Sequence, residues 1–315
     1  MTLQGQLTPE DEAEYHDKAF GLLIPLLTLR PVPSQDAALL ATSVILRMSE
    51  QFAELAEDAQ HHLNGAFSLF GNANTKWSPS RLDVGGTAFW IYLRESLRLC
   101  FLNEQTCQFN LDLIEYDLDP LNNLDEAWAN RMTYLLARTC NICWSKSGSR
   151  SILQARIDQL QDLVEVWQDI VPETYRPWYD HQKPTDVFST IRYLSTWHVI
   201  GWQQFFAARV MLAVYSPNRP TDGSMSEVNQ YLHSKILAPA RALCGVCMSS
   251  PDVGSNINGT HLVAWCGQFF TGREEQRLLV NHLVEFMDKT KWPNKTCFER
   301  LQHIWSGQRK SWVEA

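Results

Sequence analysis

The sequence predicts an all-α fold, a single domain of roughly ten to twelve helices, on three observations. Apolar residues recur at spacings of three and four rather than alternately, which is the pattern of helices with one buried side. Glycine is scarce, at 15 of 315 residues. Proline-containing breakers separate the apolar segments, and no alternating run is long enough to predict a sheet.

The clearest helix runs through residues 89–101, where apolar residues share one side and Arg94 and Arg98 form a neighbouring row. Further helices are predicted at 11–29, 35–56, 58–70, 124–146, 151–169, 186–215, 225–249, 259–271, 273–290 and 296–306. The breakers between them are Arg30–Pro33, Trp77–Pro79, Asp119–Pro120, Val171–Pro172, Ser216–Gly223, Ser250–Pro251 and Trp292–Pro293. Ser34 and Ser226 are predicted N-caps.

This succession predicts one helical domain over residues 15–306. We expect a flexible N-terminal segment at 1–14 and a C-terminal tail at 307–315. The loop between Ser216 and Ser226 is the most flexible connection that we expect, because it holds two prolines and a glycine.

The charge balance argues against direct nucleic-acid binding. Lys and Arg number 27 and Asp and Glu 35, for a net charge of −8, and the longest basic run is Arg309–Lys310. A duplex-binding surface needs clustered cations to displace counterions from phosphates. We expect no membrane span, because no stretch approaches eighteen apolar residues. The polar, acidic N-terminus does not resemble a secretory signal. A nuclear or cytoplasmic protein with reduced thiols, not a secreted one, is therefore expected.

Two C-x-x-C pairs, Cys140–Cys143 and Cys244–Cys247, raise the question of a zinc or redox site. Structural zinc needs four converging ligands, usually on turns, and a redox pair needs a strand followed by an exposed helix N-terminus. Both pairs lie inside apolar helical sequence, which favours packing within a core. A zinc site made by the two pairs meeting in space stays an alternative. We predict no cofactor and no metal.

The helix around the second pair carries a family resemblance. Residues 236–246, ILAPARALCGV, resemble a helix of the fungus-specific transcription factor domain, the regulatory region of fungal zinc-cluster activators. Cys247 stands where that family has alanine, and Gly245 is expected to allow a close helix contact. Further segments resemble the family's motifs in the same order: His62–Ala66, Thr87–Arg94, Phe188–Ile191, Ala207–Pro217, Glu285–Pro293 and Leu301–Trp305.

The resemblance covers roughly residues 15–306 and implies a helical domain that senses signals or binds partners. Family members normally begin with a DNA-binding cluster of six cysteines. The first cysteine of this sequence is Cys100, so the DNA-binding part of the family pattern is missing from it. Direct DNA binding by this chain is therefore not expected.

No catalytic fingerprint such as G-x-S-x-G, a P-loop or H-E-x-x-H is present. Polar residues within apolar helices are instead candidates for lining an aromatic pocket between helices. The candidate ligand-binding residues are Trp90, Arg94, His198, Trp202, Gln203, Phe206, His261 and Trp265. His198 and Arg94 are also candidate catalytic donors. The competing interpretation is that all of these are core residues with satisfied polar groups.

Two functions follow as hypotheses. The first is a regulator-like domain, linked to fungal secondary metabolism, that binds a partner protein, an apolar small molecule, or both. The alternative is a cofactor-free cyclase or isomerase of the Diels–Alder type, acting on an apolar terpenoid or polyketide that it holds in a reactive conformer. In that case His198 or Arg94 would polarise a carbonyl. A closed cavity favours a pocket, whereas a filled core with an exposed apolar face favours a protein partner.

Overall fold

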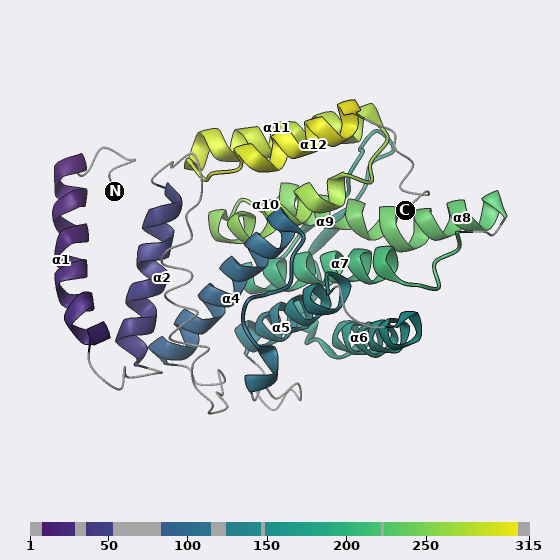
Figure 1. Ribbon diagram of the computed structural model, residues 1–315. Coiled ribbons are helices and arrows are strands. Elements are labelled where there is room, and N and C mark those ends of the chain that lie inside the picture. Colours follow the sequence, from purple (N-terminus) through teal and green to yellow (C-terminus); the bar gives the residue numbers. More distant parts are fainter. Residues whose placement is uncertain are drawn as a thin grey trace. The chain divides into compact units, whose positions relative to one another are not determined.

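The computed structural model describes residues 8–28, 36–52, 83–114, 124–145, 149–221 and 224–307 (Figure 1). These residues are helical apart from one two-stranded sheet and the connecting loops, so the predicted all-α class is confirmed. The chain forms two compact units. The N-terminal unit comprises residues 1–92 and 108–116, and the C-terminal unit comprises residues 93–107 and 117–315. The domain limits predicted at residues 15 and 306 stay predictions.

Several predicted features lie outside the described residues. They are the helix at 58–70 with its His62–Ala66 motif, the Ser34 cap, the breakers at 30–33, 77–79 and 119–120, and the Arg309–Lys310 pair.

The N-terminal unit contains α1 (Pro9–Thr28), α2 (Ala37–Phe52), the first part of α4 (Val84–Asn103) and the 3₁₀ turn η2 (Leu111–Leu113). The carboxylate of Asp36 accepts the Leu39 N–H at 2.9 Å and so caps the start of α2. Leu40 and Val44, four apart, are buried on one side of this helix. The ring of Phe109 packs edge-on against Phe89 at 5.7 Å. In this part of α2, two apolar residues at a spacing of four therefore share the buried side.

The C-terminal unit is built around α7 (Thr196–Tyr215), whose neighbours among the described elements include four α-helices (Figure 1). These are α5 (Asp125–Cys143), α6 (Arg150–Ile170), α9 (Ala238–Ser249) and α10 (Val253–Gly267). Most of α7 is buried, as expected for a helix that is apolar on every side. The remaining elements are η3 (Glu173–Tyr175), β1 (Tyr179–His181), β2 (Thr190–Arg192), α8 (Met225–Tyr231), the π-helical turn η4 (Leu232–Leu237), α11 (Arg273–Thr290) and α12 (Lys295–Gly307).

The helix predicted at 186–215 is wrong over its first ten residues. Strands β1 and β2 form an antiparallel hairpin in which Asp180 pairs with Ile191. Helix α7 begins only after Ser195, whose hydroxyl accepts the Trp197 N–H at 3.2 Å. The hairpin packs on α9, where the Ile191 N–H donates to the Ser249 hydroxyl at 3.1 Å. This support from a distant helix is the reason that spacing alone did not predict the strands.

The helix predicted at 225–249 is a succession of α8, η4 and α9. Ser224, not the predicted Ser226, caps α8 in a capping box with Glu227. The π turn lies directly before Pro239, which has no N–H to donate to the carbonyl of Lys235, so the helix continues with a local change of pitch.

The helix predicted at 259–271 begins earlier, because the carboxylate of Asp252 accepts the Ser255 N–H at 2.6 Å and caps α10 there. The helix predicted at 273–290 matches α11, which ends at Thr290 and is followed by Lys291 in the left-handed conformation, with a φ of 61°.

Candidate functional site

Trp202 on α7 lies among packed aromatic rings of the C-terminal unit. Its centroid is 5.5 Å from Trp167 and 5.6 Å from Phe206. The Trp202 N–H donates to the carbonyl of Tyr175 at 2.8 Å, and the Trp167 N–H donates to that of Trp128 at 3.0 Å. Both indole donors, that of the buried Trp167 and that of the half-buried Trp202, are therefore satisfied by protein carbonyls. The contacts bring the predicted residues Trp202 and Phe206, both half-buried, together in one aromatic cluster.

His198, one turn before Trp202, links the η3 turn to the start of α5. Its side chain is 2% exposed, and Nε2 lies 2.8 Å from Oδ2 of Asp125, off the direction of a good hydrogen bond. The Tyr175 ring packs on the imidazole at 4.4 Å, and its hydroxyl donates to the carbonyl of Asp125. Thr174 donates to the other oxygen of the same carboxylate at 3.0 Å. His198 therefore packs between the η3 turn and the start of α5.

Arg94, on the part of α4 that belongs to the C-terminal unit, is buried between α5 and α7. Its guanidinium donates to the side-chain oxygen of Asn130 and lies 5.4 Å from the ring centroid of Trp197. An arginine over a tryptophan face is attracted by the negative potential of the ring. The guanidinium of Arg94 therefore interacts with side chains of the protein itself.

Gln203 and its neighbour Gln204 connect α7 to two other helices. The Gln203 amide donates to Sγ of Cys247 at 3.2 Å, and the Thr133 hydroxyl donates to Oε1 of Gln204 at 2.8 Å. Among the described residues, Oε1 of Gln203 has no hydrogen-bond partner. Gln204 is not among the predicted site residues. Its place inside an apolar helix beside Gln203 is the signal that would have found it.

His261 and Trp265, both predicted, lie on α10 in a second aromatic cluster. Both rings contact Phe101, with centroids at 5.7 and 5.6 Å, and the Trp265 N–H donates to Glu104 at 3.2 Å. Burial, and then the charge of Arg98, lower the pKa of His261 to about 3. The imidazole is therefore neutral near pH 7 and cannot act there as an acid.

The eight predicted residues thus occupy several places. His198, Trp202 and Phe206 belong to one cluster, His261 and Trp265 to another, and Trp90 to the N-terminal unit, where its ring packs on Phe89 at 5.1 Å. No described ring contact joins the two clusters of the C-terminal unit. Their role in ligand binding stays a prediction.

The cysteines form separate groups of buried thiols. Cys140 and Cys143 lie with Cys100 and Cys107, whose sulfurs are 3.3 Å apart, whereas Cys244 and Cys247 lie with Cys266. The two C-x-x-C pairs therefore do not meet. Burial raises the pKa of Cys140 to about 11 and that of Cys247 to about 12, so both are protonated at pH 7. Within the described ranges, no three His, Cys, Asp or Glu residues are arranged to hold a metal ion.

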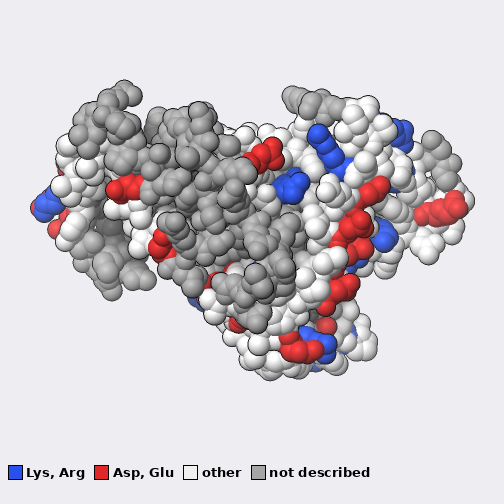
Figure 2. Space-filling model, turned by 90° about the horizontal axis from the view of Figure 1, so that it is seen from below, with Lys and Arg blue, Asp and Glu red and all other residues white. Residues whose placement is uncertain are grey.

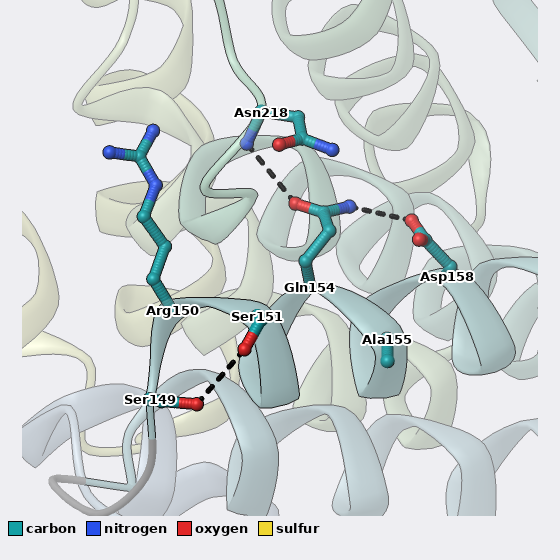
Figure 3. Close-up of a pocket in the computed structure, with 7 residues that line it drawn as sticks. All are labelled: Ser149, Arg150, Ser151, Gln154, Ala155, Asp158 and Asn218. Carbon is teal, nitrogen blue, oxygen red and sulfur yellow. Dashed lines mark hydrogen bonds between the residues drawn. The ribbon is translucent and has the colours of Figure 1, made fainter.

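A hollow of about 710 Å³ opens at the start of α6, beside the turn that follows α7 (Figure 3). It is lined by Ser149, Arg150, Ser151, Gln154, Ala155, Asp158 and Asn218. Gln154 crosses it, accepting the Asn218 N–H at 3.1 Å and donating to Asp158 at 2.6 Å. None of the predicted site residues lines this hollow. Sequence reasoning missed it because two segments about 60 residues apart form it together.

Helix α6 has two apolar sides. The inner side buries Ile157, Leu160, Val164 and Trp167 against α5 and α7. On the outer side, Ile152, Val166 and Ile170 are 50%, 49% and 45% exposed. With Ala155, Gln159 and Leu163 they follow spacings of three and four along the helix. We call these six residues the outer row. It is an apolar helix surface that the described chain leaves uncovered.

Comparison of the chain with protein-family models, curated proteins and solved structures found no match. No described helix is both long enough and apolar enough to cross a membrane.

Proposed function

We propose that this chain is a helical regulatory domain that acts by binding a partner protein. The outer row of α6 carries the proposal. A helix that has already buried one side gains nothing in its own fold from a second apolar side, and exposed apolar surface of this kind is typical of interaction sites.

The aromatic clusters support a protein partner over an enclosed small molecule. The rings of Trp202 and Trp265 pack on other rings, and their N–H groups donate to protein acceptors. A pocket for an apolar guest needs uncovered aromatic faces and free polar groups that converge on the ligand. No described contact favours the cyclase alternative over the regulator.

The resemblance of residues 15–306 to the fungal regulatory domain agrees with this function. We infer a role in the nucleus or cytoplasm, in control of secondary metabolism, through a partner rather than through direct contact with DNA. The net charge of −8 also opposes direct binding to phosphates.

Site-specific photocrosslinking tests the proposal. A photoreactive residue replaces Gln159 in the outer row and, as a matched control, the exposed Gln302 on α12. We expect one protein to crosslink in native cells from position 159 and not from 302, and to form a complex when both components are purified. Failure of position 159 to crosslink any protein would overturn the proposal, and an apolar compound from cell extract that binds or is converted would favour the cyclase instead.

A further inference from the structure

We propose that the outer row of α6 docks an amphipathic helix of the partner, and that this helix carries lysine or arginine along one flank. The inference rests on the proposed function and adds the chemistry of the partner to it.

The shape of the outer row suits a helix. It runs from Ile152 to Ile170, about 27 Å at the helical rise of 1.5 Å per residue. The row is straight and narrow, as in helices that pack side by side with apolar residues at spacings of three and four. A partner helix of about five turns would cover it.

Acidic residues beside the outer row indicate that the partner helix carries basic residues. Asp158, Asp162, Glu165 and Asp169 are exposed and follow one another at spacings of four, three and four, directly beside the outer row. Figure 2 shows acidic side chains in a row on the side of the C-terminal unit where α6 lies. None of the four carboxylates forms an ion pair with a described Lys or Arg. Cations on the partner would therefore meet four available carboxylates.

The hollow at the start of α6 is lined by residues from both the outer row and the acidic group. Ala155 of the outer row and Asp158, the first of the four acidic residues, line it together (Figure 3). Asp158 is held by the Gln154 amide at 2.6 Å, and its carboxylate stays exposed. A lysine or arginine of the partner would extend into this hollow while its aliphatic stem lies over Ala155.

Other occupants fit less well. A second copy of the chain, paired antiparallel through the same rows, would bring its four carboxylates toward those of the first, and like charges repel. An anionic lipid surface or a nucleic acid would be repelled in the same way.

The probe is a synthetic helical peptide of about 21 residues, with leucines at spacings of three and four and lysines on one flank. Binding to the full chain is followed by fluorescence anisotropy at about 0.1 M and about 0.5 M salt. A scrambled peptide of the same composition and a peptide with glutamate in place of lysine serve as controls. The α6 variant combines Asp162→Lys with Asp169→Lys. The α11 variant, which combines Glu285→Lys with Asp288→Lys, is the control, because it makes the same change in net charge on the exposed side of another helix.

We expect the lysine peptide to bind and the α6 variant to weaken it by about tenfold, while the α11 variant stays within about twofold. Higher salt should weaken binding of wild type more than of the α6 variant. Equal binding of the scrambled peptide, or equal weakening by both variants, would overturn the proposal. If position 159 crosslinks a partner segment that is acidic or non-helical, this inference fails although the proposed function stands. If nothing crosslinks there, both fail.

Discussion

Replacing Gly245 with alanine tests how α9 packs against the hairpin. A Cβ at this position would lie 2.5 Å from the carbonyl oxygen of Ser189, about 0.9 Å short of an ordinary contact. That oxygen belongs to the backbone, so it can move only with the hairpin. Moving the hairpin strains the bond from the Ile191 N–H to the Ser249 hydroxyl, 3.1 Å long.

Three effects determine the size of the change. Overpacking costs about 1–3 kcal/mol, and loss of the hairpin hydrogen bond about 1 kcal/mol more. Alanine favours the helix over glycine by about 1 kcal/mol, which offsets the lost bond. The free energy of unfolding should therefore fall by about 1–3 kcal/mol.

Urea unfolding, followed by circular dichroism, measures this loss. Gly254→Ala in α10 is the control, because the only neighbour within 4 Å of its Cβ would be a side-chain oxygen of Asp252 at 3.4 Å. We expect this control to be as stable as wild type or more stable by up to about 1 kcal/mol, because alanine favours the helix over glycine. If Gly245→Ala unfolds at the same urea concentration as wild type, the close contact with the hairpin is wrong.

Three further predictions concern acid stability, capping and thiols. The unfolded chain takes up a proton at His261 below about pH 6.5, which the folded chain does not do until about pH 3. The free energy of unfolding should thus fall as the pH drops through this window, by about 2 kcal/mol at pH 5, and His261→Phe should remove that part of the slope in urea titrations. Ser224→Ala removes the capping box of α8 and should cost about 1 kcal/mol or fray that helix, seen as faster hydrogen exchange at residues 225–231 and unchanged exchange in α11. All eight cysteines are buried thiols, so Ellman's reagent should react with few of them in the native protein and with all eight in urea; fast native reaction would contradict the packing.

The helical class and most helix positions could be predicted from the sequence, because apolar residues at spacings of three and four are typical of helices. The match at α11 is close, since acidic residues begin that helix and a proline follows its end. The interpretation of Gly245 as a close contact also holds, although its partner is a hairpin and not a helix. Local spacing and composition were enough to predict these features, because the residues that form the buried side of a helix and those that begin and end it lie close together in the sequence.

Only the tertiary structure decided what covers each apolar row. Leu160 and Val166 are both apolar residues of α6, yet the first is buried and the second exposed, because α5 and α7 contact one side of the helix alone. The hairpin at 179–192 likewise depends on α9, about 55 residues away along the chain. Helical spacing shows which residues share a side, but burial depends on neighbours that are distant in sequence. The outer row on α6 could therefore be identified only after the neighbouring helices were in place.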